Sequence, residues 1–368
     1  MNTALGLHES GRLEEAKAIY EKILNRNPEH ADALHLLGLA HHQHGKNDIA
    51  LRLIRKAIQI DPKRPVFYHS LGSTLDDLRQ TDEAILCYQK AIRLKPDYTE
   101  AFFSLANLFH SNLKITEAIH CYQKAIHFKP DFVDAYYFMG NLFQNEMMLN
   151  QAVRCYQKAV QLKPDMANAY CNMGNAFQAQ GKYQEALECY KKATCLKPDL
   201  AEVFSNMGSA CKELGQWDKS FACYKKAVQL KPDYAEAFNN MGNLFESIGK
   251  LHEAAVNYRK AIKLKPDFAE ACSNMGNVIK AQGDVSRAIE YYKKAIALNP
   301  NYDKAHSDLL FAMHYAPSRD PSAIFSESLA WWKQHGRPVM NKFDHNERAA
   351  FKRLRVGYVS PDFRQHSV

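Results

Sequence analysis

The segment from residue 167 to residue 200 reads ANAYCNMGNAFQAQGKYQEALECYKKATCLKPDL, and its pattern recurs along most of the chain. A proline near its end, Pro198, has counterparts at intervals of 34 residues. The full set is Pro28, Pro62, Pro96, Pro130, Pro164, Pro198, Pro232, Pro266 and Pro300. A fixed period of this length indicates repeated units, each too small to bury its own apolar face, that stack to form a continuous core.

Each repeat has the pattern of two amphipathic helices joined by a turn. In this segment Met173 and Phe177 fall on one face of the first helix, and Tyr190 and Ala193 fall on one face of the second. A glycine or alanine occupies the eighth position of the repeats, and here it is Gly174. A small residue lets the paired helices approach closely, so a bulky side chain at Gly174 is expected to overpack them, at a cost of roughly 1–3 kcal/mol.

The turn after the first helix has its own residue pattern. A residue in the left-handed region ends a helix there, and glycine adopts that conformation at little cost. Six turns have this glycine, namely Gly11, Gly45, Gly181, Gly215, Gly249 and Gly283. Three other repeats have Arg79, Leu113 and Met147 at the same position, and we expect their turns to be less ideal. The recurring proline closes the second helix, because proline cannot continue a helix.

A period of 34 residues with these helix and turn residues resembles the tetratricopeptide repeat (TPR) family, over residues 1 to about 315. The resemblance implies an all-α fold, a TPR superhelical solenoid of helix–turn–helix repeats over residues 1–316. We expect a partial first repeat, eight full repeats over residues 31–300, and a polar capping helix over residues 303–314.

Residues 317–350 are predicted to contain a docking helix followed by a polar linker. The helix should begin at Asp320 and Pro321, because proline is well tolerated in the first helical turn. Trp331 and Trp332 lie on this helix, and we expect them to pack on the end of the solenoid rather than to form a ligand platform.

Composition narrows the class of protein. With 368 residues, 46% hydrophobic residues and 24% charged residues, the chain is of globular type. No apolar run approaches the roughly 18 residues that a membrane span needs, and the N-terminus lacks a signal-peptide pattern. The net charge of +8 is mild, and no stripe of Lys and Arg with interleaved aromatic residues predicts nucleic-acid binding. We therefore expect a soluble cytoplasmic protein, with a nuclear location also open for a eukaryotic source.

The nine cysteines do not predict a metal site or a disulfide framework. Five of them occupy the same position in successive repeats, namely Cys87, Cys121, Cys155, Cys189 and Cys223. No CxxC pair occurs, so we interpret the cysteines as reduced, small apolar residues. The histidines His41, His42 and His44 also lack the spacing of two metal ligands on one helical face, and no metal is expected.

Asparagines recur at two positions of the first helix, the sixth and the ninth. The sixth carries Asn172, Asn206, Asn240 and Asn274, and the ninth carries Asn107, Asn141, Asn175, Asn243 and Asn277. Positions three apart share a helix face. Since first helices line the concave surface of a stacked array, the C-terminal half of this groove is predicted to be lined by amides and the N-terminal end is not.

The asparagines have two interpretations. An amide offers both a C=O and an NH₂, so a row of them could satisfy the main chain of an extended peptide without reading its side chains. The alternative is that they cap or bridge neighbouring helices. The register of the two rows favours peptide binding, and we expect client proteins as partners, bound as extended peptides. Replacing the four sixth-position asparagines by alanine should then weaken client binding and leave the thermal melt nearly unchanged.

The C-terminal residues have a different pattern from the repeats. Val356 to Val359 read as a short strand before a Ser-Pro-Asp turn, so residues 351–368 are predicted to be the first strand and loop of a truncated α/β domain. Together with the repeats, RLRVGYVSPDFRQHSV, beginning at Arg353, resembles the O-linked N-acetylglucosamine transferase family, in its SPINDLY-type branch. In that family the matching histidine lies in the active-site cleft, and the resemblance makes His366 a candidate catalytic residue.

This resemblance implies a protein O-glycosyltransferase. The repeats would be its client-binding region, and the enzyme would transfer a sugar to Ser or Thr from UDP-N-acetylglucosamine or, in SPINDLY-type relatives, from GDP-fucose. The sugar-nucleotide site has no counterpart in residues 1–368, so we expect this chain to be inactive by itself and to hold no cofactor. A non-enzymatic TPR scaffold and the strand of an unrelated α/β domain are the alternatives, and a homodimer is left open.

A scaffold that clamps a terminal carboxylate would add Lys or Arg beside the groove asparagines. The fifth position of the repeats carries no such cation, since it reads His35, His69, Phe103, Tyr137, Cys171, Ser205, Asn239 and Ser273. That version of the scaffold is therefore disfavoured.

Overall fold

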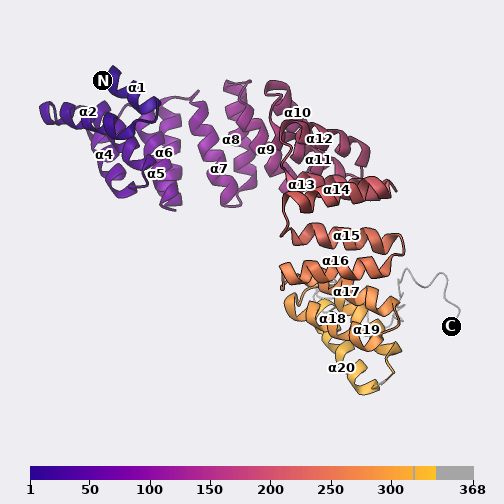
Figure 1. Cartoon of the computed structure of the whole chain (residues 1–368). Coiled ribbons are helices and arrows are strands. Elements are labelled where there is room, and N and C mark those ends of the chain that lie inside the picture. Colours follow the sequence, from indigo (N-terminus) through magenta and orange to yellow (C-terminus); the bar gives the residue numbers. More distant parts are fainter. Residues whose placement is uncertain (318–319, 337–368) are drawn as a thin grey trace, which may run out of the picture. The chain divides into compact units, whose positions relative to one another are not determined.

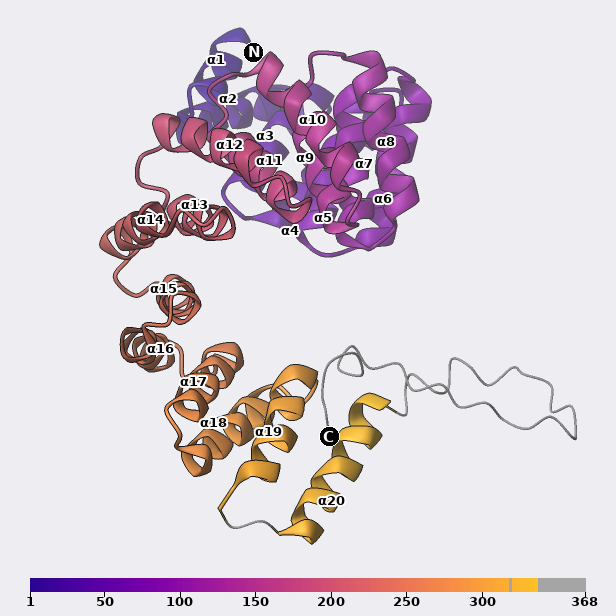
Figure 2. The same ribbon diagram turned by 90° about the vertical axis from the view of Figure 1, so that its right-hand side faces the viewer.

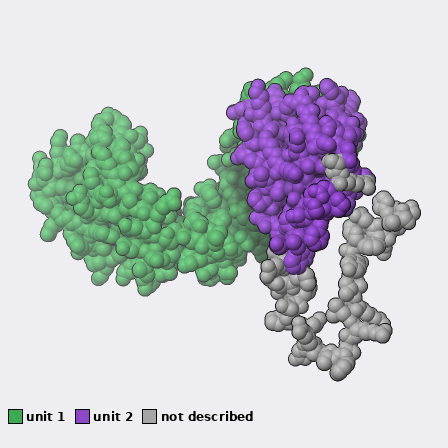
Figure 3. All heavy atoms as spheres, turned by 90° about the horizontal axis from the view of Figure 1, so that it is seen from below, with its two compact units in different colours: residues 1–232 green, residues 233–368 purple. Residues whose placement is uncertain are grey.

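The computed structural model describes residues 1–317 and 320–336, and within these residues every regular element is a helix (Figure 1). None of these helices has both the length and the apolar character that crossing a membrane requires. The chain divides into two compact units, unit 1 at Met1–Pro232 and unit 2 beginning at Asp233, coloured separately in Figure 3. The predicted all-helical TPR architecture is confirmed in each unit.

Unit 1 contains fourteen helices, which form seven pairs in chain order. They are α1 (Asn2–Glu9), α2 (Leu13–Arg26), α3 (Ala31–Gln43), α4 (Asn47–Ile60), α5 (Pro65–Asp77), α6 (Thr81–Leu94), α7 (Thr99–Ser111), α8 (Ile115–Phe128), α9 (Val133–Asn145), α10 (Leu149–Leu162), α11 (Ala167–Ala179), α12 (Tyr183–Leu196), α13 (Ala201–Glu213) and α14 (Trp217–Leu230). The odd-numbered helix of each pair is called the first helix and the even-numbered one the second helix.

Unit 2 contains two further repeats and the C-terminal helices. Its elements are α15 (Ala235–Ser247), α16 (Leu251–Leu264), α17 (Ala269–Ala281), α18 (Val285–Leu298), α19 (Asp303–Tyr315), α20 (Pro321–Trp331) and the short π-helical turn η1 (Trp332–Gly336). Figure 2 shows α15 and α16 nearly end-on, lying beside each other as the two helices of one repeat.

A glycine–tyrosine contact sets the spacing of the two helices in most repeats. The ring of Tyr190 is fully buried, and a Cβ placed on Gly174 would lie only 2.5 Å from its Cε1 atom. The tyrosine packs over the bare backbone of the first helix, where a side chain would overlap it. The same tyrosine is buried in eight repeats, as Tyr20, Tyr88, Tyr122, Tyr156, Tyr190, Tyr224, Tyr258 and Tyr292. In the repeats of Tyr20 and Tyr122 the first helix has alanine in place of the glycine.

All turns between the paired helices of the repeats use the left-handed conformation. Gly181 has a φ of +73° there, as expected for glycine. Arg79, Leu113 and Met147 are also left-handed, with φ of 57–58°, although side chains disfavour this region. The stacked repeats therefore impose one turn geometry whether or not the residue suits it.

The C-terminal helices of unit 2 are joined by polar contacts. Helix α20 begins at Pro321, where the Asp320 carboxylate accepts a hydrogen bond of 2.9 Å from the Ser322 N–H. It packs on α19 through a 2.7 Å contact between His306 and Glu327. Helix α20, which falls within the segment 317–350, thus lies against α19. The predicted strand over residues 351–368, with His366, lies outside the described residues.

Candidate functional site

The asparagines of the sixth and ninth positions lie on successive first helices. In unit 1 they are on α7, α9, α11 and α13, which contact one another in sequence, and in unit 2 they are on α15 and α17. We call the unit 1 set the amide face, defined by Asn107, Asn141, Asn172, Asn175 and Asn206. Each of these five residues is half-buried.

Each ninth-position amide is tied to the tyrosine of the second helix. The hydroxyl of Tyr156 donates to Asn141 Oδ1 at 2.8 Å, and Tyr190 makes the same bond to Asn175 at 2.8 Å. Tyr122 pairs with Asn107 in the same way, as do Tyr258 with Asn243 and Tyr292 with Asn277. The tyrosine that spaces the helices therefore also holds the amide on the opposite helix.

The sixth-position amides form a second kind of bond, between repeats. Asn172 Nδ2 donates to Asn141 Oδ1 at 2.9 Å, and Asn206 Nδ2 donates to Asn175 Oδ1 at 2.9 Å. Asn172 Nδ2 also donates to the hydroxyl of Tyr137 at 3.2 Å. In unit 2, Asn274 is likewise bonded to Asn243 at 3.0 Å and to Asn239 at 3.1 Å, and it is buried. The bridging interpretation of the asparagines is thus correct for these residues.

The bridges leave the two amides of a pair with complementary free ends. Asn141 uses its oxygen for both bonds, so its NH₂ remains, and among the described residues the structure gives that NH₂ no acceptor. Asn172 uses both N–H groups, so its oxygen remains. An amide bonded through one end must present the other. The amide face therefore offers a fixed donor on α9 next to a fixed acceptor on α11.

In the bridged pairs each asparagine therefore has one end of its amide left over, not both. It also follows that alanine at Asn172 removes two hydrogen bonds, each worth about 1 kcal/mol. For the same reason we now expect the alanine variants to melt at a lower temperature than the wild type, in place of the nearly unchanged melt that the sequence suggested. The repeat period of the sequence predicted where these asparagines lie. It could not predict the hydrogen bonds between them, because those bonds join residues of neighbouring repeats.

Two hollows follow the amide face. One, of about 820 Å³, is lined by Asn107, Asn141 and Asn172 together with Phe138 and Gln144. The other, of about 540 Å³, lies between α11 and α13 and is lined by residues that include Asn175, Asn206 and Glu213. The asparagines therefore border open, partly polar depressions along the first helices rather than a closed cavity.

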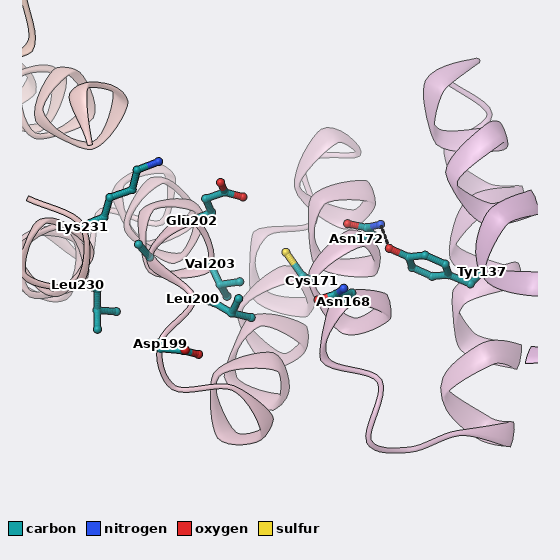
Figure 4. A pocket seen from close by; sticks show the side chains of 11 residues that line it. Tyr137, Asn168, Cys171, Asn172, Asp199, Leu200, Glu202, Val203, Leu230 and Lys231 are labelled. Atoms are coloured by element: carbon teal, nitrogen blue, oxygen red, sulfur yellow. Dashed lines mark hydrogen bonds between the residues drawn. The ribbon is translucent and has the colours of Figure 1, made fainter. Parts of the chain in front are cut away.

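A third hollow, of about 600 Å³, adjoins the same face. Figure 4 shows the Tyr137 hydroxyl pointing toward the amide nitrogen of Asn172, with Cys171 nearby on the same helix as Asn172. Glu202 and Lys231 lie on the opposite side of the hollow. This hollow therefore has the bridged amide of Asn172 on one side and charged groups of both signs on the other.

The N-terminal repeats bridge their first helices with different side chains. His35 Nε2 lies 2.9 Å from Ser70 Oγ, and His69 Nε2 lies 3.0 Å from Ser104 Oγ. Burial lowers the pKa of His35 to about 4, and the positive charge of Arg64 lowers it further. Burial also lowers the pKa of His69. This role of the histidines was not predicted from the sequence, although their recurrence at the fifth repeat position is visible in it.

Comparison with known families and structures gives the following. TPR repeat models match residues 77–112, 114–146, 149–181, 208–249 and 245–283, and tetratricopeptide repeat models match residues 2–65, 167–200 and 269–302. No curated protein sequence matches the chain significantly. The similar solved structures include that of MamA (25% identity, TM-score 0.40, 45% of this chain and 97% of that one). Another is that of YrrB, titled a TPR protein with an unusual peptide-binding site (26% identity, TM-score 0.39, 50% of this chain and 95% of that one). The chain belongs to the tetratricopeptide repeat family.

Proposed function

We propose that the amide face binds an extended segment of a client protein by its main chain. The supporting observation is the pair of complementary free ends, an NH₂ on Asn141 and a C=O on Asn172, held by hydrogen bonds to Tyr156 and to each other. An extended chain offers one N–H and one C=O per residue. A fixed donor beside a fixed acceptor can therefore meet both groups of one client residue.

Recognition of this kind depends little on client sequence. Amides bonded to the main chain do not read side chains, so clients of different sequence should bind with similar affinity. Because the amides are already held in place, the protein loses little side-chain entropy on binding. We therefore infer a binding region for many clients rather than for one partner.

The sharpest test exchanges the free donor without breaking the bridge. Asn141→Asp and Asn175→Asp together keep the oxygen that accepts from tyrosine and asparagine, but replace each NH₂ by a carboxylate oxygen, including that of Asn175, which contacts the Cys171 thiol. We expect an extended peptide to bind at least tenfold more weakly to this double variant, measured by fluorescence anisotropy with a labelled client segment and with a scrambled version of it.

The matched control is Asn150→Asp, on the exposed surface of the second helix α10, which adds charge away from the amide face. It should leave affinity within about twofold. Equal binding by the double variant and the wild type would contradict the proposal. A scrambled peptide that fails to bind would also contradict it, because main-chain recognition predicts similar affinities for the two peptides.

We further infer that the bound clients are substrates of a protein O-glycosyltransferase. The support is that residues 353–366 resemble the opening of that enzyme family's catalytic region. These residues lie outside the part of the chain that the structure describes. His366 is the candidate catalytic residue, and UDP-N-acetylglucosamine or GDP-fucose is the candidate donor. A TPR scaffold without catalytic activity is equally consistent with the repeats.

An assay of sugar transfer separates these two functions. Residues 1–368 alone should transfer no sugar from either donor to a bound client, as measured by the mass of the client. The product of the complete reading frame should add a sugar to Ser or Thr if the enzyme proposal holds. No transfer from either donor by that product would favour the scaffold, and transfer by residues 1–368 would contradict their expected inactivity.

A further inference from the structure

An aromatic ring lies next to the amide face. Phe138 occupies the sixth position of its repeat, where the next repeat has Asn172, and 38% of its surface is exposed. It borders the hollow of about 820 Å³ that Asn107, Asn141 and Asn172 also line. An exposed phenylalanine beside polar side chains carries a free-energy cost that burial would recover.

The ring of Phe138 is backed by other aromatic side chains. Its centroid lies 5.6 Å from that of Phe103 on the preceding first helix, with the rings edge to face, and 5.4 Å from that of Tyr137. Phe103 is in turn packed 5.0 Å from Phe132. Contacts of this geometry hold a ring in a defined orientation. Phe138 is therefore an ordered apolar surface rather than a loose side chain.

Leu113 adds apolar surface on the other side of the same hollow. It occupies the left-handed turn after α7, with φ of 58°, and 82% of its surface is exposed. Phe138, Leu113 and Asn141 thus line one and the same hollow. A peptide whose main chain is bonded at Asn141 would bring a nearby side chain over Phe138 and Leu113, because an extended chain advances about 3.3 Å per residue and every second side chain lies on the same face.

We propose that this hollow is an apolar subsite, formed by Phe138 and Leu113, which accepts one large apolar side chain of the extended client bound to the amide face. This inference rests on the proposed peptide binding and adds selectivity to it. Clients would be held by their main chain along the asparagines and positioned along the groove by one leucine or phenylalanine at this hollow. A single side chain of the client then determines which of its residues lie against the asparagines.

The test uses a labelled host peptide of alanine and serine, and a series in which one leucine is placed at each position in turn. Anisotropy should show that leucine at one position raises affinity about tenfold, equivalent to about 1.4 kcal/mol. Phe138→Asn, which gives this position the residue of the later repeats, should abolish this gain, measured as the ratio of the affinities of the leucine peptide and the host peptide for the same variant. A thermal melt establishes that the variant is folded.

Phe128→Asn is the matched control, because Phe128 is equally exposed, at 39%, but lies on the second helix α8, where it stacks on Phe102. This variant should keep the full gain from leucine. If the gain survives in Phe138→Asn, or if no leucine position gains affinity while the host peptide binds, the subsite is overturned. If the host peptide does not bind but the leucine peptide does, and only with Phe138 present, the main-chain proposal fails and the subsite stands.

Discussion

Two parts of unit 1 share one backbone architecture but bridge their first helices with different chemistry. In residues 31–111 the bridges join an imidazole to a hydroxyl, as in His35 and Ser70. In residues 133–213 the contact at the same two repeat positions joins an amide to a phenol, as in Asn172 and Tyr137. Asn172 there makes an additional bond to the amide of Asn141, at the ninth position. The same point of contact between repeats therefore accepts either chemistry, and the helix packing does not require the asparagines.

The difference also decides what each part offers to a ligand. Ser70 is buried and His35 is 4% exposed, so the bonded pair shows little to solvent. The amides of Asn141 and Asn172 are half-buried, and each has one end left over. An amide also keeps its charge state at every pH, whereas an imidazole does not. The bridge between His35 and Ser70 is therefore only structural, whereas the amide bridge of Asn141 and Asn172 also has groups left to bind a peptide.

The largest expected difference between the two parts is their response to acid. Burial holds the pKa of His35 at about 4, below its ordinary value of 6.5, so the unfolded chain takes up a proton at a pH where the folded one does not. The stabilisation is complete above pH 6.5 and is lost as the pH falls toward 4, by on the order of 3 kcal/mol. Arg64, His8 and His69 face the same imidazole and oppose its protonation.

Hydrogen–deuterium exchange at pH 7.5 and pH 4.5 measures this difference. The amides of α3 to α5 should lose more protection in acid than those of α9 to α12. His35→Asn, a residue that the chain itself uses at the same position as Asn239, should reduce the acid loss in α3 to α5. Equal acid loss in the variant and the wild type would show that the imidazole is not responsible.

Helix packing in the two parts of unit 1 can be compared at one glycine in each, Gly38 in the N-terminal part and Gly174 in the later repeats. Gly174→Ala would place a Cβ 2.5 Å from a rigid ring atom of Tyr190, whereas Gly38→Ala would place one 2.8 Å from Cγ1 of the flexible Ile54. We expect the first change to destabilise the protein by about 2 kcal/mol, within the range for overpacking. The second should be close to neutral, because Ile54 can move and alanine favours helix. Urea denaturation of both variants tests this, and equal losses would contradict the role given to the tyrosine ring.

The smallest expected effect concerns the turns. Met147 holds a left-handed φ of 57° with 70% of its surface exposed, whereas Gly45 fills the equivalent turn in the N-terminal part. Met147→Gly should raise the free energy of unfolding by about 1 kcal/mol, since the strain is relieved and little packing is lost. Gly45→Met should lower it by a similar amount. Thermal melts of the two variants would refute this if both moved in the same direction.

Much of this architecture follows from the sequence, because the period of 34 residues, the eighth-position small residue and the turn glycines are visible in it. The location of the asparagines on one helix face also followed from their spacing. Their hydrogen bonds could not be predicted, because Asn172 is bonded to Asn141 of the neighbouring repeat and Tyr156 is bonded to Asn141 from a different helix. Which end of an amide remains free depends on those partners, so it appears only once the helices are placed. The same holds for Phe138, whose exposure depends on the packing of Phe103.

The central claim is that tyrosine hydroxyls fix the amides for main-chain binding, and one pair of variants tests it directly. Tyr190→Phe removes the 2.8 Å bond to Asn175, whereas Tyr224→Phe removes a 3.0 Å bond to Ser209, in a repeat whose ninth position has no amide. Both changes remove a buried hydroxyl and should cost similar stability, about 1 kcal/mol. In an anisotropy titration with an extended peptide, Tyr190→Phe should weaken binding about tenfold and Tyr224→Phe should leave it unchanged. Equal affinity in both variants would contradict the claim.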